Sequence, residues 1–222
     1  MALKDNINCL CPTKEELDVT NYIMMEQYLN NNKIDCIIHT AAITSVEKCE
    51  MDRGLAYNVN VIGTRNIINI ISKRGIKLIY ISTPCVFDGK TGNYNEDSLP
   101  YPENYYGFTK AVTEELIKSS GLEYLIVRVN FVENKKYEYP KAFTDRYGTY
   151  LFADQIAENI INHISDKGII HIVGSKKMSM FDLARLCKTD VQPMTINEYK
   201  GKTRLTMDMS MTSNRIEPID II

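Results

Sequence analysis

The sequence lacks several features that would point to particular classes of protein. It has no tryptophan, and only three of its 222 residues are histidine. The 26 basic and 28 acidic side chains nearly balance, so charge gives no reason to expect nucleic acid or an anionic membrane as a partner. No apolar run approaches the ~18 residues that span a bilayer. The first twenty residues lack a basic stretch followed by a long apolar core, so we expect no secretory signal.

The cysteines and histidines match no metal-binding template. Cys9-x-Cys11 has no second pair beside it, and the three histidines are far apart in the sequence. Scattered cysteines without a signal sequence favour a cytoplasmic protein whose thiols are reduced and mostly buried. We therefore predict neither a metal site nor a disulfide. The other four cysteines are Cys36, Cys49, Cys85 and Cys187.

The composition is that of an ordinary soluble globular protein. Hydrophobic residues make up 44% of the chain and charged residues 24%, which argues against disorder. At this length we expect one large domain, or one domain with a short appendage. Short apolar runs alternate with longer amphipathic stretches. The predicted strands are Ile7–Cys11, Asp35–Thr40, Lys77–Ser82, Glu123–Val129 and Gly168–Val173. The predicted helices are Asn21–Asn31, Arg53–Lys73, Tyr105–Ser119, Leu151–Ser165 and Met178–Lys188.

This alternation predicts an α/β protein with a doubly wound parallel sheet. Strands without clean polar alternation are buried on both faces, and the intervening helices would cover those faces. Asp88–Glu103 is predicted to be a loop, and residues 189–222 are weakly patterned. Sheets of this kind bind ligands at the carboxyl ends of their strands. Residues that directly follow a strand are therefore the first candidates for chemistry.

Two segments after the strand Lys77–Ser82 carry groups suited to proton transfer. Ser82 and Thr83 end the strand, and Tyr106 and Lys110 lie four residues apart on one face of a helix. A phenol with a pKa near ~10 exchanges protons poorly at neutral pH, and a nearby ammonium lowers that pKa. With a hydroxyl from Ser82 or Thr83 on the same substrate oxygen, these groups could protonate a carbonyl or deprotonate an alcohol during hydride transfer. The alternative is a solvated helix face that carries an aromatic side chain.

Several blocks, taken in order, resemble segments of dTDP-4-dehydrorhamnose reductases, which are extended short-chain dehydrogenase/reductases. The likeness runs from about residue 15 to residue 132 and continues weakly to residue 187. The blocks are Ile34–Glu50 (IDCIIHTAAITSVEKCE), Asn58–Thr64 (NVNVIGT), Ser82–Gly89 (STPCVFDG), Tyr94–Asp97 (YNED) and Tyr106–Lys110 (YGFTK).

This resemblance implies a Rossmann-like fold and NAD(P)H-dependent reduction of a 4-keto-6-deoxy nucleotide sugar. Tyr106 would be the catalytic acid/base, Lys110 its electrostatic partner and ribose anchor, and Thr83 the hydroxyl that tunes the tyrosine. The cofactor would be NADP or NAD, and the partner a nucleotide-sugar substrate. A homodimer through helices Arg53–Lys73 and Tyr105–Ser119 is expected by analogy alone.

The resemblance also implies which residues line the cofactor and the substrate. Asp18 and Val19 would lie by the adenine, and Asn60 would brace the end of a strand. Asp18 has an alternative role in a helix cap, and Asn60 in a purely structural hydrogen bond. Close packing is the alternative for Ala41 and Ala42. The implied cofactor-binding residues are Asp18, Val19, Ala41, Ala42, Ile43, Asn60, Ser82, Tyr106, Lys110 and Asn130. The implied substrate-binding residues are Thr44, Cys85 and Phe131.

One departure from the family concerns the cofactor. The sequence contains no G-x-x-G-x-x-G, the loop that lets backbone N–H groups approach the pyrophosphate. Met1–Asn6 would be the end of the helix that follows this loop, so the fold would lack its first strand. An unpaired edge inside a sheet costs about 1–3 kcal/mol for each unsatisfied group. We therefore expect that Ile7–Cys11 shifts inward, that the sheet is split or repaired by another chain, or that the gene product is shortened.

A second departure concerns the substrate side. The family's STDYVF reads STPCVF at Ser82–Phe87, so an acid and a phenol near the sugar are missing. Pro84 would stiffen the turn, and Cys85 is small and apolar. The segment after Val132 is shorter than the family's sugar-binding insertion. We therefore predict a truncated NAD(P)-binding domain at residues 1–132 and a small C-terminal substrate lobe at residues 133–222.

Three hypotheses about function follow from these matches and departures. The chain is a reductase, or a non-catalytic regulatory subunit such as the reductase-like β subunit of methionine adenosyltransferase, or a truncated form of an ordinary reductase. The sequence leaves open whether cofactor binds, which sugar and which nicotinamide it takes, and its oligomeric state.

Overall fold

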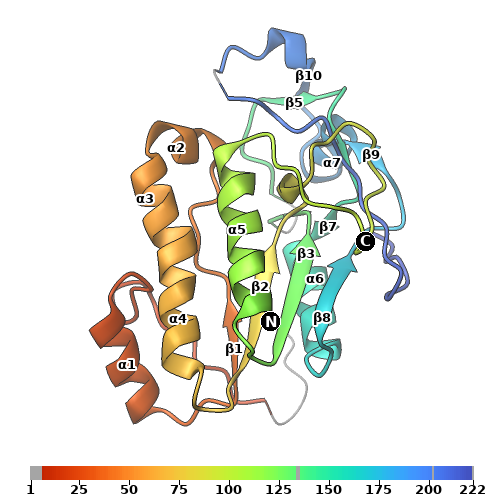
Figure 1. The fold of residues 1–222 in the computed structure, drawn as a ribbon. Helices are drawn as coiled ribbons and strands as arrows, with labels where there is room; N and C mark the ends of the chain where they lie inside the picture. Colours follow the sequence, from red (N-terminus) through yellow and green to blue (C-terminus); the bar gives the residue numbers. More distant parts are fainter. Residues whose placement is uncertain (1–6, 134–135, 202, 222) are drawn as a thin grey trace.

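The main sheet of the protein consists of four parallel strands. The structure is a computed structural model that describes residues 7–133, 136–201 and 203–221. The strand order is β1-β2-β3-β8, and the four carboxyl ends lie at one edge of the sheet, uppermost in Figure 1. The strands are β1 (Cys36–His39), β2 (Lys77–Ser82), β3 (Tyr124–Val129) and β8 (Gly168–Ile172).

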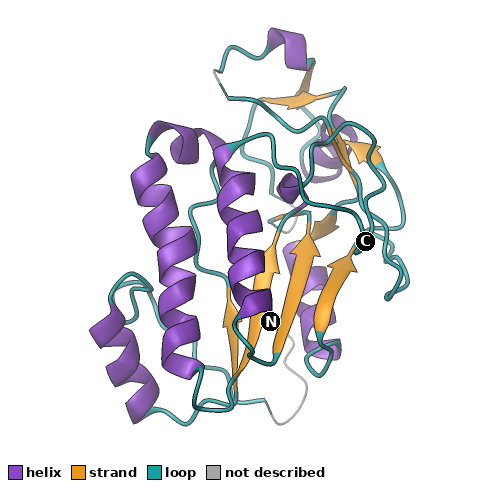
Figure 2. Ribbon diagram, in the orientation of Figure 1, coloured by secondary structure: helices purple, strands orange, loops and turns teal. Residues whose placement is uncertain are grey.

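Helices pack on both faces of this sheet, as Figure 2 shows. One face is covered by α1 (Tyr22–Asn31), α4 (Gly63–Ile71) and α5 (Tyr105–Ser119), whose apolar side chains form one core with β2 and β3. The opposite face packs against Ile156 and Ile160 of α6 (Ala153–Asn162). Burial of apolar side chains on both faces is the main stabilising contribution. The predicted doubly wound α/β fold is therefore confirmed.

The long helix predicted at Arg53–Lys73 is in fact three segments. It consists of α3 (Arg53–Tyr57), the π-helical turn η1 (Asn58–Ile62) and α4. The wider turn frees the carbonyl of Asn60, which accepts hydrogen bonds from the Thr64 hydroxyl at 2.8 Å and the Thr113 hydroxyl at 3.1 Å. The predicted long helix is therefore confirmed from Arg53 to Ile71, and the π-helical turn within it is a feature that periodicity does not reveal. A short helix before it, α2 (Val46–Met51), was not predicted.

The strand predicted at Ile7–Cys11 is not formed. These residues are irregular, because none of the described strands lies beside them to supply a hydrogen-bonding ladder. Among the described residues, β1 therefore has a neighbour on one side only. The helix end predicted at Met1–Asn6 lies outside the described residues.

A group of short elements lies beyond the carboxyl edge of the sheet, at the upper right of Figure 1. Strand β4 pairs with β7, β5 with β10, and β6 with both β9 and β11. The weakly patterned tail thus supplies two strands, and a domain boundary at residue 132 stays a prediction. The elements are η2 (Pro84–Val86), β4 (Phe131–Val132), β5 (Lys141–Phe143), β6 (Tyr147–Gly148), β7 (Leu151–Phe152), β9 (Met178–Ser179), α7 (Met180–Cys187), β10 (Gln192–Met194), η3 (Ile196–Glu198) and β11 (Asp208–Met209).

Two predicted helices begin later than expected because their first residues form strands. Leu151–Phe152 pairs with β4, so α6 begins at Ala153. Met178–Ser179 pairs with β6, and the Ser179 hydroxyl then caps α7 by accepting from the Asp182 N–H at 3.0 Å. Within the described part of the chain, no helix has the length and apolar character needed to cross a bilayer.

The prediction that most cysteines are buried was wrong. Only Cys49 and Cys85 are buried, while Cys9 and Cys11 are exposed. Cys9 and Cys11 belong to the irregular segment before α1, where no strand forms to cover them.

Candidate active site

Tyr106 lies in the first turn of α5, at the carboxyl edge of the sheet. Helix α5 begins where the sequence predicted, because the Asn104 side chain accepts from the Gly107 N–H at 2.9 Å. The Glu50 carboxylate accepts from the Tyr105 N–H at 2.8 Å. A Cβ at Gly107 would lie 2.0 Å from the carbonyl oxygen of Cys85. Glycine at position 107 therefore lets the start of α5 pack directly on the turn that follows β2.

Of the two hydroxyls at the end of β2, the one beside Tyr106 belongs to Thr83. The Thr83 side chain lies close enough to Tyr106 to lower the pKa of its phenol, and its oxygen accepts from the Cys85 N–H at 3.2 Å. The Ser82 hydroxyl instead donates to the Glu114 carboxylate at 2.5 Å. The structure thus resolves the choice that the sequence left open, in favour of Thr83.

The phenol of Tyr106 is neutral at ordinary pH. Burial raises its pKa above the usual range, nearby Cys85 raises it further, and the hydrogen bond with Thr83 opposes this. The sequence predicted a lowered pKa from the Lys110 ammonium, and that prediction was wrong because burial dominates. A neutral phenol is the form that donates a proton.

Lys110 is buried one helical turn beyond Tyr106. Its ammonium donates to the carbonyl oxygen of Ile81 at 2.6 Å and lies 4.0 Å from the centre of the Tyr80 ring. Burial lowers its pKa to about 7, although the negative charge of Glu114 acts in the opposite direction. Lys110 is therefore held at the end of β2, and its predicted role beside the phenol of Tyr106 stays a prediction.

Behind these groups lies a buried ion pair that sequence reasoning missed. Arg128 on β3 donates to the Glu114 carboxylate on α5 at 2.6 and 3.0 Å, and both side chains are 1% exposed. The Arg128 guanidinium also lies 5.0 Å from the centre of the Phe87 ring. The pair joins the helix that carries Tyr106 and Lys110 to the middle of the sheet. The two residues are on different elements, so no local pattern could have revealed them.

Asn60 ties the loop after β1 to α5. Its side chain accepts from the Ile43 N–H at 2.8 Å, and it donates to the Ile43 carbonyl at 3.1 Å and the Thr109 hydroxyl at 3.0 Å. Asn60 therefore braces the strand end, as the resemblance implied, through hydrogen bonds that also satisfy the structural alternative. Ala42 is half-buried beside the exposed Ala41 and Thr44. Their roles toward a cofactor or substrate remain predictions.

Asp18 and Val19 form a tight turn that is fixed to α4. The Asp18 carboxylate accepts from the Thr20 N–H at 2.8 Å and the Thr20 hydroxyl at 2.7 Å, and these bonds hold its pKa below the usual range. The Val19 carbonyl accepts from the Asn66 amide at 3.1 Å. Asp18 thus fixes the turn before α1, whereas the cap of that helix is Asn21, and the cofactor role of Asp18 remains a prediction.

The roles of the remaining predicted residues, Cys85 and Phe131 toward the substrate and Asn130 toward the cofactor, stay predictions. Cys85 belongs to one buried cluster with Tyr106, and its sulfur is 3.8 Å from the sulfur of Met209. The carbonyl of Asn130 accepts from the Leu151 N–H at 3.1 Å. Phe131 is 46% exposed. The cluster contains Cys49, Ala56, Cys85, Tyr106, Tyr150, Met178, Leu183 and Met209.

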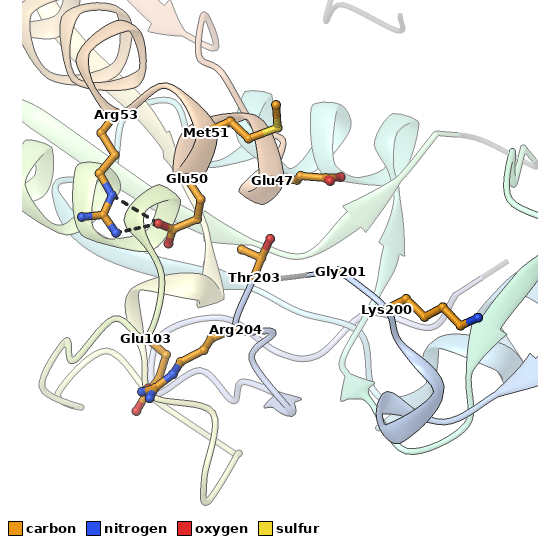
Figure 3. Close-up of a pocket in the computed structure, with 9 residues that line it drawn as sticks. All are labelled: Glu47, Glu50, Met51, Arg53, Glu103, Lys200, Gly201, Thr203 and Arg204. Carbon is orange, nitrogen blue, oxygen red and sulfur yellow. Dashed lines mark hydrogen bonds and ion pairs between the residues drawn. The ribbon is translucent and has the colours of Figure 1, made fainter.

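An open cleft of about 790 Å³ lies near the start of α5, and Figure 3 draws the residues that line it. It adjoins α5 through Glu50, which binds the Tyr105 N–H and also pairs with Arg53 at 2.8 Å. Three carboxylates and three cations line the cleft. Sequence reasoning missed it because its walls come from three distant segments. The lining residues are Glu47, Glu50, Met51, Arg53, Glu103, Lys200, Gly201, Thr203 and Arg204.

Comparisons with known proteins agree with this geometry. The family described as "RmlD substrate binding domain" matches residues 1–218. The dTDP-4-dehydrorhamnose reductase of Aggregatibacter actinomycetemcomitans is 31% identical over 192 residues, 76% of this chain and 65% of that protein. Methionine adenosyltransferase 2 subunit beta of Xenopus laevis is 26% identical over 245 residues, 95% of this chain and 72% of that protein. The crystal structure of dTDP-4-dehydrorhamnose reductase from Bacillus anthracis str. Ames, in complex with NADP, has a TM-score of 0.83 and 26% identity, over 93% of this chain and 84% of that chain.

Proposed function

The chain belongs to the RmlD substrate-binding-domain family, and from this premise we propose that it reduces a 4-keto-6-deoxy nucleotide sugar. One observation carries the proposal: a neutral, buried phenol, Tyr106, lies beside the Thr83 hydroxyl at the carboxyl edge of a parallel sheet. The substrate class comes from the reductases that the chain resembles. A nicotinamide dinucleotide, bound in the related reductase structure, would supply the hydride.

In this proposal Tyr106 donates the proton that completes reduction. As the keto carbon is reduced, its oxygen becomes negative and takes the proton from the Tyr106 hydroxyl. Thr83, beside the phenol, would donate its single hydroxyl hydrogen to the same oxygen. The phenolate that remains is stabilised by the Lys110 ammonium one turn away, where the Ile81 carbonyl fixes that side chain.

The residues fit the reacting end of a nicotinamide dinucleotide better than its diphosphate. Tyr106, Thr83 and Lys110 provide the proton-transfer groups. The sequence, however, contains no glycine before Gly54, so no glycine near β1 allows the close backbone approach that a diphosphate requires. We therefore propose that the 222-residue chain holds the dinucleotide weakly.

We assign the nucleotide part of the substrate to the cleft in Figure 3. It opens beside the first turn of α5, so a sugar at Tyr106 would extend into it. Arg53, Lys200 and Arg204 supply positive charge for a diphosphate. Arg53 is paired with the Glu50 carboxylate, and a guanidinium nitrogen of Arg204 lies 3.4 Å from a carboxylate oxygen of Glu103. These carboxylates would orient the guanidinium groups.

A second candidate function is a non-catalytic regulatory subunit. The similarity to methionine adenosyltransferase 2 subunit beta over 95% of the chain favours it. Titration of the 222-residue chain with NADPH distinguishes the two functions. Micromolar or tighter binding would count against the regulatory subunit, whereas no detectable binding, together with no turnover, would favour it.

Substitution of Tyr106 tests the reductase directly. With a dTDP-4-keto-6-deoxy sugar and NADPH or NADH, we expect Tyr106→Phe to lower turnover about 10²–10⁴-fold, because the proton donor is lost while the ring still packs. Tyr105→Phe removes the same oxygen from the neighbouring residue and is the matched control. Turnover that survives Tyr106→Phe unchanged would refute the assignment of the acid.

A further inference from the structure

A second phenol is buried beside the proposed acid. Tyr150 directly precedes β7, is 1% exposed, and belongs to the same cluster as Tyr106, Cys85 and Met209. Burial raises the pKa of Tyr150 to about 12, and Arg146 nearby acts in the opposite direction. Tyr150 is therefore a neutral hydrogen-bonding group within the candidate active site, and the proton transfer above does not use it.

The polar atoms of Tyr150 and Asn130 are left without partners. Neither the Tyr150 hydroxyl oxygen nor the Asn130 side-chain nitrogen has a hydrogen bond to any described residue, although both are buried. The Asn130 amide faces the phenol and lowers its pKa, but the two groups do not complete a well-aligned bond. A buried donor without a hydrogen bond costs about 1–3 kcal/mol, so folded proteins contain few of them. Two such groups side by side point to a ligand.

Gly148 creates the space in which these two groups meet. A Cβ at this position would lie 2.6 Å from the Asn130 side-chain nitrogen and 2.7 Å from the Tyr150 ring carbon that bears the hydroxyl. Any larger residue on β6 would push the pair apart. The pair is thus assembled from the residue after β3 and the segment between β6 and β7.

Met209 is the part of the cluster that can most easily move for a ligand. Its sulfur lies 3.8 Å from the Cys85 sulfur and 3.4 Å from an Arg146 side-chain nitrogen. The methionine side chain is unbranched and adapts to different shapes at little cost. It belongs to β11, a strand of two residues. A shift of this side chain would make room beside both phenols.

We propose that Tyr150, with Asn130, is a specificity-determining residue that hydrogen-bonds a hydroxyl of the sugar next to its keto carbon. This inference rests on the proposed function, because Tyr106 fixes where the keto oxygen lies. Because Tyr150 belongs to the same cluster as Tyr106, it would contact the sugar of the substrate. The nucleotide would extend away from it, into the cleft of Figure 3. A buried site that donates hydrogen bonds in this way rejects analogues lacking the hydroxyl.

Tyr150→Phe tests the proposal because it removes one oxygen and keeps the ring. We expect the KM for the 4-keto nucleotide sugar to rise about tenfold, because one hydrogen bond to the substrate is lost. The melting temperature should stay the same or rise, because an unpaired buried hydroxyl is removed. Affinity for dTDP alone should not change. An unchanged KM, or an equal loss of affinity for dTDP, would overturn the proposal.

A matched control separates this role from a structural one. Thr206 also carries a buried hydroxyl without a partner among the described residues, but it packs beside Gly89, where an added Cβ would lie 2.2 Å from its methyl carbon. Thr206→Val should therefore change stability in the same direction as Tyr150→Phe and leave the KM unchanged. A KM raised equally in both variants would mean that the effect is not specific to Tyr150.

A binding measurement keeps this proposal distinct from the proposed function. Calorimetry of the full chain with dTDP-rhamnose needs no turnover, and we expect Tyr150→Phe to weaken binding about tenfold relative to the wild type. If the wild type binds this sugar without reducing the keto form, the proposed function fails while the Tyr150 comparison still stands. If the wild type binds no nucleotide sugar, both fail.

Discussion

The end of β2 and the end of β1, which are neighbours at the carboxyl edge of the sheet, differ in how completely they are built. At the end of β2, Thr83, Tyr106 and Lys110 are buried and have partners among neighbouring side chains or carbonyls. At the end of β1, Ala41 and Thr44 are exposed. The proposed proton-transfer residues are thus enclosed, whereas the end of β1 is more open. The two parts are joined through Asn60, which binds both Ile43 and Thr109.

Burial along the sheet explains this difference. The residues of β2 and β3 are almost all buried, while three of the four residues of β1 are half-buried. Among the described residues β1 is an edge strand, so its outer N–H and C=O groups have no ladder partner. Rigidity should therefore fall from the proton-transfer end toward the nucleotide end, and substitutions at the two ends should differ in their cost.

The largest effect is expected at the buried ion pair behind Tyr106. Glu114→Gln leaves the Arg128 guanidinium charged and unpaired in the core, which destabilises a protein by about 3–5 kcal/mol. Denaturant unfolding measured by circular dichroism gives this free energy. The substitution keeps the size of the side chain, so lost packing does not account for the result.

The adjacent residue provides the control for this prediction. Glu115 pairs with Lys118 at 2.6 Å, but its side chain is 64% exposed. Glu115→Gln should therefore cost less than about 0.5 kcal/mol. If the two variants lost similar stability, burial would not explain why substitutions at the end of β2 and at the end of β1 differ in their cost.

These predictions also mark what the sequence could reveal. The bounds of Lys77–Ser82 and Tyr105–Ser119 followed from local patterns, because strand composition and the Asn104 cap act over a few residues. The positions of Thr83, Tyr106 and Lys110 followed from their order along the chain. The raised pKa of Tyr106 did not follow, because burial depends on side chains from distant segments that pack around it.

The same reasoning explains which parts of the site were missed. Glu114 and Arg128 are ordinary charged residues in sequence and become a pair only when α5 packs on β3. Tyr150 stands in a segment of short strands that has no clear periodicity. The strand expected at Ile7–Cys11 failed for a related reason, since a strand needs a neighbour that a local pattern cannot supply.

A smaller effect is expected from the pH dependence of stability. Lys110 has a pKa of about 7 in the folded protein, below its ordinary value of 10.5. Between these values the unfolded chain binds more protons than the folded one, so stability should rise with pH. The slope from one group is at most about 1.4 kcal/mol per pH unit. Urea unfolding at pH 7, 8 and 9 measures this slope.

Lys110→Met should remove this dependence on pH. The range from pH 7 to 9 is the useful one because burial raises the pKa values of Cys36 and Cys49 to about 11, so these thiols act in the opposite direction above pH 9. Burial lowers the pKa values of His39 and His171 to about 3 and about 4, so these groups act only in acid. A slope that persists in Lys110→Met would show that another group is responsible.

The smallest effect is expected at the nucleotide end, at Asp18. Asp18→Asn keeps a side-chain oxygen that can accept from the Thr20 N–H and hydroxyl, so we expect a loss of less than about 1 kcal/mol on urea unfolding. Asp18→Ala removes this acceptor and should cost more, which makes it the reference for the role in the turn. If Asp18 serves only that turn, affinity for NADPH should change less than twofold in Asp18→Asn. A several-fold loss of affinity at unchanged stability would instead place the carboxylate against the cofactor, and the nucleotide end would then be more fully built than its exposure indicates.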